Sequence, residues 1–386
     1  MDKKKITVFI QDMKGDEWLG GKNYYENLEK IVTSHYPEIS FRAFDFMKSE
    51  PAPVVRVSLF SRIIRKFFPG SAKPVPRPSK VPQLKQLAGD SQIVIFSGHS
   101  IQNIPGLPFI FWIPDFQFLH LPEIASEKHV EWFRNNIRKG SEIATLVMLS
   151  SLNGLKDFKS FLPEYIGKAH VVPFAKKIAP EFLDIDIQPL LGKYHLPERF
   201  FYLPNQFWKH KNHQLVLEAL AILKKEGKCP FVVFSGYTSD FRHPGHFETL
   251  LKFVSENNLR DHVAFLGVIP FPDVIGLIRL SVAVINPSLF EGWSTTVEEV
   301  KSIGKKMLLS DLDVHKEQDP ENAVFFPQKD AQVLAKKMTE VFAATDPVKD
   351  RQYEKEALQR YSKKENEFAA NFRQLIDTAI QLSGNK

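Results

Sequence analysis

The segment PSLFEGWSTTVEE, residues 287–299, follows the apolar run VAVIN at 282–286 and begins a helical pattern. An apolar strand that passes through a glycine-containing turn into a helix is the unit from which parallel α/β sheets are built. Gly292 lets the backbone approach a ligand. The Ser-Thr-Thr run at 294–296 favours a helix start, where free N–H groups point outward. The segment therefore predicts a site for an anion such as a phosphate.

Two carboxylates frame this helix start. Glu291 precedes it, and Glu299 lies eight positions later, about one turn inside the helix. Both side chains can face one ligand from different depths, which suits a charged molecule rich in hydroxyl groups. The alternative is a helix N-terminus with two surface glutamates, in which Glu291 caps the helix.

The Glu-x7-Glu spacing resembles that of the retaining glycosyltransferases of family 4, also called glycosyl transferases group 1, whose usual wording is close to PSxxEGxxxxxxE. Three more blocks resemble the same family. FYLPNQFWKHKNHQLVLEAL at 201–220 is similar to the first strand, loop and helix of its donor domain. WIPDFQFLHLPE at 112–123 resembles the acceptor-domain segment of enzymes that build bacterial surface polysaccharides, and WLGGKNYYENL at 18–28 resembles the amino-terminal glycine-rich loop.

Short apolar runs alternate with amphipathic helical stretches, and this rhythm predicts parallel sheets flanked by helices. One series of strands is expected near 5–11, 39–45, 92–98, 108–114, 144–150 and 169–174. A second series is expected near 200–204, 230–236, 263–267, 282–286, 306–310 and 323–327. Helices are expected at 22–36, 123–139 and 152–161. The fold class is α/β, and the resemblance implies the GT-B fold, with two Rossmann-like doubly wound domains facing a central cleft.

The domain boundaries follow from these two series. We expect an acceptor-binding domain at 1–178, a linker at 179–199 and a donor-binding domain at 200–348. The resemblance implies that helices in 349–386 cross back to the first domain. Ligands of open α/β sheets bind beyond the carboxyl ends of the strands, and all four blocks follow predicted strands, so they should converge on one crevice.

Composition is consistent with this organisation. The chain has 386 residues, of which 43% are apolar and 25% charged, enough for two domains with separate cores. The single cysteine, Cys229, excludes an intramolecular disulfide, and no Cys/His spacing resembles a zinc site. The apolar run after the basic start is too short for a signal peptide, and no run approaches the roughly 20 apolar residues of a membrane span. The expected location is the cytoplasm, including the inner face of the membrane.

The resemblance assigns roles to residues of the site. Lys211 and the helix start would neutralise charge on the departing phosphate. Glu299 would hold the ribose hydroxyls, and Glu291 would bind donor hydroxyls and stabilise positive charge on the sugar. The donor-side candidates are Gly20, Gly21, Asn205, Lys211, Val268, Glu291, Gly292, Ser294, Thr295, Thr296 and Glu299. The catalytic candidates are Glu291, Lys211 and Asp115, and the acceptor-side candidates are Asp115, Gln117 and His120.

A nucleotide-sugar is the implied co-substrate, and we expect no other cofactor. No metal is expected, because no Asp-x-Asp type of carboxylate cluster follows a strand in the donor domain. Lys211 could instead be a solvated lysine at a helix start, and Gly20 and Gly21 could form only a tight turn.

The chain departs from the family pattern at two positions. Many relatives have a basic residue six places before the lysine, where this chain has Asn205, which cannot supply charge. Many also have a histidine where this chain has Phe118. His120 could replace the missing imidazole, or it could be a helix-start histidine without a catalytic role.

Residues 51–89 contain eight Lys or Arg and no Asp or Glu. The candidates for contact with an anionic membrane are Phe60, Arg62, Arg65, Lys66 and Phe67, on a basic, partly amphipathic helix. The alternative is a core-packed helix with a solvated basic edge. Nucleic acid is not expected as a partner, because the net charge is only +6 and no recognised motif accompanies the patch.

These observations predict a retaining glycosyltransferase. It would move a sugar from a UDP- or GDP-linked donor to a growing, lipid-linked bacterial glycan. Two alternatives remain at this level: a sugar-nucleotide epimerase of the same fold, and a non-catalytic GT-B partner subunit, which Asn205 and Phe118 favour.

Overall fold

The structure is a computed structural model of the chain, and it describes residues 4–12, 19–46, 79–101, 104–176, 178 and 180–384. The chain divides into two compact units. The first comprises Met1–Trp112, Asn136–Val147 and Arg373–Lys386, and the second Ile113–Asn135 and Met148–Phe372. The domain boundaries expected from the sequence stay predictions.

Six strands form the first sheet, in the order β2-β1-β3-β4-β5-β6. They are β1 Ile6–Gln11, β2 Ile39–Phe44, β3 Gln92–Ser97, β4 Phe109–Ile113, β5 Leu146–Leu149 and β6 Ala169–Val171. β1 pairs in parallel with β2 and with β3, and β3 pairs in parallel with β4. Every residue of β4 is buried, as expected for a parallel strand covered on both faces.

The second sheet has the order β12-β11-β10-β7-β8-β9. Its strands are β7 Phe200–Leu203, β8 Phe231–Phe234, β9 Val263–Phe265, β10 Ala283–Asn286, β11 Met307–Ser310 and β12 Ala323–Phe326. All five neighbouring pairs are parallel. Counted from β7, the strand order is 3-2-1-4-5-6, which is the doubly wound arrangement, and its switch point lies between β7 and β10.

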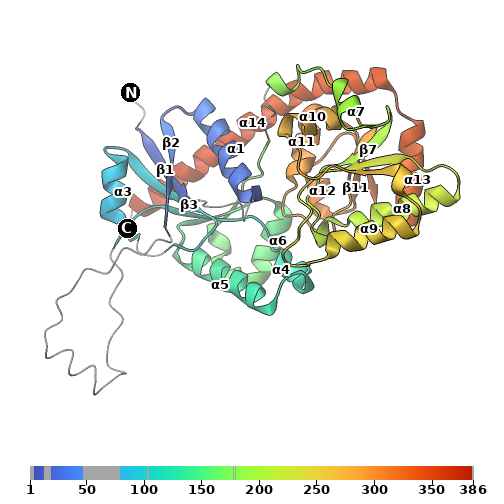
Figure 1. Cartoon of the computed structure of the whole chain (residues 1–386). Helices are drawn as coiled ribbons and strands as arrows, with labels where there is room; N and C mark the ends of the chain where they lie inside the picture. The colour runs from blue at the N-terminus through green and yellow to red at the C-terminus, as the bar shows by residue number, and fades with distance from the viewer. Residues whose placement is uncertain are drawn as a thin grey trace, which may run out of the picture. The chain divides into compact units, whose positions relative to one another are not determined.

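Helices cover both faces of the second sheet (Figure 1). On one face lie α8 His213–Lys225, α9 His246–Glu256 and α13 Ala331–Ala343. On the other face lie α7 Pro189–Lys193, α10 Phe271–Leu280 and α11 Thr295–Ile303. Aromatic and aliphatic side chains fill both layers, so the sheet is a rigid platform for the loops at its ends.

The other helices are α1 Leu19–His35, α3 Val81–Ala88, α4 Gln117–His120, α5 Glu127–Ile143, α6 Leu152–Phe161, α12 Asp313–Glu317 and α14 Pro347–Gly384. Short 3-10 turns lie at η1 Pro122–Ile124, η2 Pro163–Lys168, η3 Pro180–Phe182, η4 Lys209–Lys211 and η5 Arg260–His262. α14 begins in the second unit, and its last turns belong to the first.

The α/β class is confirmed, and each of the twelve predicted strands is present within three residues of its expected ends. The helix predicted at 123–139 was placed wrongly. Pro122 begins a separate 3-10 turn, and α5 starts only at Glu127, where Ser126 Oγ accepts a bond from the His129 N–H at 3.4 Å. The stretch predicted as a linker contains α7, whose Leu190 packs into the second unit's core.

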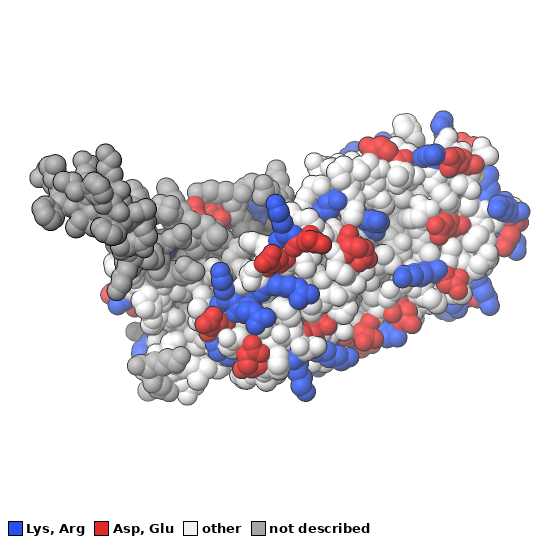
Figure 2. Space-filling view, turned by 90° about the horizontal axis from the view of Figure 1, so that it is seen from below, with Lys and Arg blue, Asp and Glu red and all other residues white. Residues whose placement is uncertain are grey.

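On the face seen in Figure 2, acidic and basic side chains of the described residues are interspersed. This distribution agrees with the modest net charge of +6. No helix among the described residues combines the length and apolarity needed to cross a bilayer. The membrane candidates Phe60, Arg62, Arg65, Lys66 and Phe67 lie outside the described residues, so membrane contact stays a prediction.

Candidate active site at the switch point of the second sheet

The site begins where β7 and β10 end side by side. Asn205, just after β7, donates through Nδ2 to Asn286 Oδ1 at 3.2 Å and accepts from Thr296 Oγ1 at 2.9 Å. Asn286 in turn donates to Ser294 Oγ at 3.0 Å. Asn205 is 3% exposed. Its amide therefore joins the two strand ends to the start of α11, which explains why an uncharged residue occupies this position.

Lys211 and Glu291 form an ion pair beside this network. Lys211 Nζ lies 2.7 Å from Glu291 Oε1, and the two side chains are 17% and 8% exposed. Ser288 Oγ also donates to Glu291 Oε1 at 2.7 Å. Burial alone would raise the pKa of Glu291, but the Lys211 charge, helped by His315 and the Ser288 bond, holds it below its usual value. Glu291 is thus ionised and does not cap α11, whose N-cap residue is Ser294.

The start of α11 offers backbone donors, whereas the side chains of Ser294 and Thr296 are already hydrogen-bonded. Ser294 donates its N–H to Gln318 Oε1 at 3.2 Å, and Gln318 Nε2 returns a bond to the Ser294 carbonyl at 3.0 Å. The N–H groups of Thr295, Thr296 and Val297 follow in the first turn, where no intrahelical acceptor exists. The predicted phosphate cradle therefore consists of main-chain N–H groups.

The two adjacent glutamates of α11 have opposite environments. Glu298 is 2% exposed and accepts hydrogen bonds from Gln318, Lys301 and Tyr361. Glu299 has no hydrogen-bond partner for its carboxylate among the residues that the structure describes. Burial raises the pKa of Glu299 to about 7, against the opposing charge of Lys176. The carboxylate of Glu298 is therefore occupied by the protein itself, and a ligand role for Glu299 stays a prediction.

Glu299→Gln is expected to stabilise the ligand-free protein at pH 8. The folded-state pKa of Glu299 lies above its usual value of 4.5, so its favourable contribution is present below about pH 4.5 and is lost as pH rises through 7. Glutamine removes this penalty, which is of order 3 kcal/mol. Thermal unfolding at pH 8 and pH 4.5 should show a higher melting temperature for the variant only at pH 8. Glu298→Gln is the matched control, and it should be destabilising at pH 8.

Residues 287–294, between β10 and α11, form the Glu291 loop, and its Gly292 contacts Asp115. A Cβ at position 292 would lie 2.4 Å from the Pro114 carbonyl oxygen and 2.5 Å from Asp115 Cβ, so only glycine permits this contact. Burial raises the pKa of Asp115, and Glu291 raises it further. The Gln117 N–H, Lys211 and Arg242 oppose this rise. Asp115 therefore belongs to one electrostatic cluster with the Lys211–Glu291 pair.

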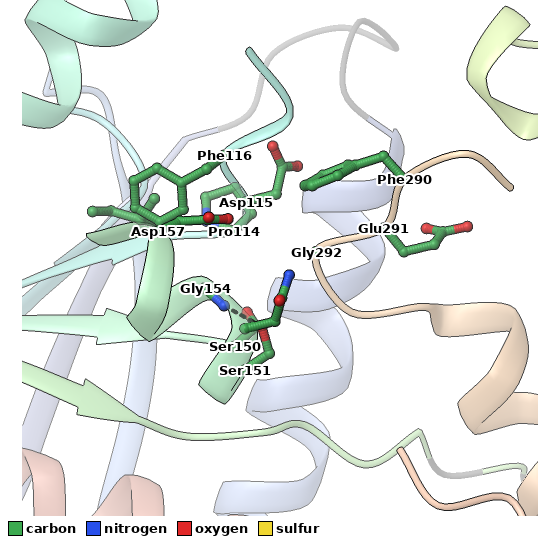
Figure 3. Close-up of a pocket in the computed structure, with 12 residues that line it drawn as sticks. Pro114, Asp115, Phe116, Ser150, Ser151, Gly154, Asp157, Phe290, Glu291 and Gly292 are labelled. Carbon is green, nitrogen blue, oxygen red and sulfur yellow. Dashed lines mark hydrogen bonds between the residues drawn. The ribbon is translucent and has the colours of Figure 1, made fainter. Parts of the chain in front are cut away.

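A pocket of about 230 Å³ opens between the ends of β4 and β5 and the Glu291 loop (Figure 3). Its wall combines polar and aromatic groups. Those that the figure labels are Pro114, Asp115, Phe116, Ser150, Ser151, Gly154, Asp157, Phe290, Glu291 and Gly292. The carboxylate of Glu291 points away from the serines of the pocket. This volume includes open solvent, so the pocket is a shallow polar recess and its size does not select a ligand.

The remaining acceptor-side candidates lie on α4. His120 is its last residue rather than a helix start, and Nε2 lies 2.8 Å from Asp157 Oδ2 while the ring stacks on Phe290 at 5.1 Å. Gln117 Oε1 accepts from Arg242 at 3.1 Å. Phe118 is 6% exposed and packs against three other phenylalanine rings, so hydrophobic packing explains this departure from the family pattern.

Three donor-side candidates lie apart from this cluster in the sequence. Gly20 and Gly21 belong to the first turn of α1 rather than to the loop before it, and that loop is outside the described residues. Val268 follows β9 and is 74% exposed. Their roles stay predictions. Within the described part of the chain, no group of three or more His, Cys, Asp or Glu residues has the geometry of a metal site.

Sequence reasoning missed three residues of this site. Arg242 and Asp240 lie in the loop after β8, and Asp157 lies on α6. The loop after β8 could have been predicted as part of the site, because all strands of a parallel sheet end at the same edge and the loops that follow them start there. Asp157 lies within a helix and left no comparable signal.

Comparison with known proteins gives three kinds of match. Residues 192–360 match the family described as glycosyl transferases group 1. A stretch of 153 residues is 27% identical to the serotype-specific mannosyltransferase WbdA of Escherichia coli. That match covers 38% of this chain and only 18% of WbdA, so the chain spans a small part of that relative.

Solved structures share the fold over nearly the whole chain. A glycosyltransferase from Rickettsia africae has a TM-score of 0.64 at 14% identity and covers 99% of this chain and 100% of its own. HepE of Anabaena, in complex with UDP and glucose, has a TM-score of 0.65 at 14% identity, covering 96% and 98%. Sucrose-phosphate synthase of Thermosynechococcus elongatus has a TM-score of 0.64 at 16% identity, and the match covers 97% of this chain and 98% of that protein's chain. These matches confirm the GT-B fold.

The region that matches the family contains Lys211, the Glu291 loop and Glu299. The roles of these residues stay predictions. Residues 192–360, somewhat less than half of the chain, are thus similar to the family of glycosyl transferases group 1.

Proposed function

We propose that this chain is a retaining glycosyltransferase that needs no metal ion. It moves a sugar from a UDP- or GDP-linked donor to a growing bacterial glycan carried on a lipid. The observation that supports this most directly is the buried Lys211–Glu291 pair beside the open start of α11, at the switch point where doubly wound sheets bind nucleotides.

The leaving group in this proposal is a nucleoside diphosphate. Its charge would be neutralised by Lys211 and by the backbone N–H groups at 295–297, with the helix dipole adding to the effect. At the other end of the nucleotide, the ribose hydroxyls would donate to the unpartnered carboxylate of Glu299. Binding should therefore strengthen as pH rises through about 7, where Glu299 ionises.

The sugar would lie between the Glu291 loop and Asp115. As the bond from the anomeric carbon to the phosphate oxygen breaks, the ionised Glu291 stabilises the positive charge that develops on the sugar. The acceptor hydroxyl attacks from the same face, and its proton passes to the departing phosphate oxygen. The acceptor would approach along the pocket beside this loop, where Asp115, Ser151 and Asp157 offer polar contacts and Phe290 an apolar wall.

The two departures from the family pattern give no argument for a non-catalytic subunit. Asn205 has a place in the buried amide network, and Phe118 has one in an aromatic cluster. The proposal of a lipid carrier is based on the basic, aromatic stretch 59–68, which lies outside the described residues, and on the similarity to a serotype-specific mannosyltransferase.

Titration calorimetry with UDP and GDP tests the donor site. We expect at least one of them to bind, and Glu299→Ala to weaken that nucleotide by about 1.5–3 kcal/mol. Sugar nucleotides that carry the nucleotide that binds are then incubated with the protein and a bacterial lipid extract, with and without EDTA. The anomeric configuration of the product is determined by NMR. Transfer with retention that survives EDTA is expected. Isomerisation of the donor without transfer would favour an epimerase, and failure to bind either nucleotide would exclude both enzymes.

A further inference from the structure

Arg242 lies in the loop that follows β8, the strand next to β7. The loop starts at Gly236, which has φ 138°, and a Cβ there would lie 2.6 Å from the carbonyl oxygen of Asn205. The loop therefore begins in contact with the backbone that leads to Lys211. Its continuation can add a side chain to the same site.

Three neighbours fix the guanidinium of Arg242. Nε lies 3.2 Å from Asp240 Oδ1, Nη1 donates to Gln117 Oε1 at 3.1 Å, and Cζ lies 4.9 Å from the centre of the Trp208 ring. The side chain is only 15% exposed. Such a planar cation, held on two edges and one face, is preorganised for a further bidentate or single contact.

One nitrogen of this guanidinium is unused. Arg242 Nη2 is buried and has no hydrogen-bond partner among the described residues. Buried polar groups are almost always paired, and leaving one unpaired costs about 1–3 kcal/mol. Nδ1 of His210, whose pKa is lowered by burial and further by the charges of Lys211 and Arg242, is also buried without a partner. This edge of the site thus holds one certain donor, Arg242 Nη2, and one ring nitrogen that no described residue satisfies.

The charge of Arg242 acts on the same group as the catalytic pair. The charges of Glu291, Lys211 and Arg242 all act on the pKa of Asp115, Glu291 raising it and the two cations lowering it. A departing diphosphate carries more than one negative charge, whereas Lys211 already shares its charge with Glu291. Asn205, at the end of β7, adds no charge.

We infer that Arg242 binds a phosphate oxygen of the donor's diphosphate through Nη2, and that it supplies a second cation beside Lys211. This inference rests on the proposed function, because it requires a nucleoside diphosphate in the site. The several N–H groups of a guanidinium allow this, because Nε can remain bonded to Asp240 while Nη2 donates to a phosphate oxygen.

The test compares charged and uncharged probes. UDP, GDP, uridine and guanosine are titrated into the wild type, Arg242→Gln, Arg242→Lys and the control Arg260→Gln. Arg260 is an exposed arginine that donates to Ser255 Oγ at 3.2 Å. We expect Arg242→Gln to weaken the preferred diphosphate about 10- to 100-fold and its nucleoside less than about twofold. Arg242→Lys should recover part of the loss, and Arg260→Gln should match the wild type.

Two results would overturn the inference: an unchanged diphosphate affinity in Arg242→Gln, or an equal loss for the diphosphate and its nucleoside, which would mark a structural role. Raising salt should also reduce the wild-type affinity more steeply than that of Arg242→Gln. If the wild type binds neither diphosphate, the proposed function itself fails. That outcome differs from one in which the wild type binds and Arg242 contributes nothing.

Discussion

Lys211→Met is expected to lower turnover by about 10²–10³-fold and to destabilise the fold by about 3–5 kcal/mol. Methionine keeps the volume of the side chain but leaves Glu291, which is 8% exposed, as a buried and unpaired carboxylate. The measurements are donor turnover and chemical denaturation at pH 7.5. Lys209→Met is the matched control, because Lys209 is an exposed residue of the same 3-10 turn.

The loss of stability should depend on pH in a defined direction. In the wild type the pKa of Glu291 is lowered, so the pair's contribution is present above the usual pKa of 4.5 and is lost as pH falls through the folded value. The difference in the free energy of unfolding between the variant and the wild type should therefore be largest near pH 7 and should shrink towards pH 4. The double variant Lys211→Met/Glu291→Gln should regain much of the stability but no turnover. Equal stability of all three proteins would contradict the buried ion pair.

Gly292→Ala is expected to cost about 1–3 kcal/mol and to reduce turnover by about 100-fold. The added Cβ would meet main-chain and Cβ atoms of 114–115, which cannot rotate away as a flexible side-chain end would. Either the Glu291 loop or the Asp115 segment must move, and the distance between them sets the geometry of the reacting groups. Gly167→Ala is the control, because nothing lies within 4 Å of its added Cβ. A variant with normal stability and turnover would show that the two segments do not need this close contact.

The strands of this fold could be predicted from sequence because each is a short, continuous apolar run bounded by turns. FFYL at 200–203 and FVVF at 231–234 are buried almost throughout, and parallel strands covered on both faces have this composition. The helix start at 295 was predictable for a similar reason, since Ser294 follows the glycine turn. The start of α5 was not, because Pro122 and Ser126 both offer a helix-opening signal and only the packing decides between them.

Side-chain roles in the site were harder to predict. Sequence spacing selected Glu299 rather than Glu298 as the ligand-binding candidate. Glu298 accepts three hydrogen bonds from the protein, whereas Glu299 has a raised pKa and no such bond among the described residues. The burial of Asn205 depends on Asn286, which lies 81 positions away, and no local pattern encodes such a contact. Arg242 belongs to no sequence motif. Its position in the site depends on the pairing of β8 with β7, which brings the loop after β8 to the end of β7.

The strand order of the second sheet also has a consequence for folding kinetics. β7 is paired on one side with β10, and the Lys211–Glu291 pair joins groups 80 residues apart. Such high contact order slows folding, because a long loop must be closed before its contacts can form. During synthesis at about 5–20 residues per second, the ribosome must add this intervening chain before the two halves of the site can meet. The donor site is therefore assembled late, and a nucleotide can stabilise the domain only after the central strands have paired.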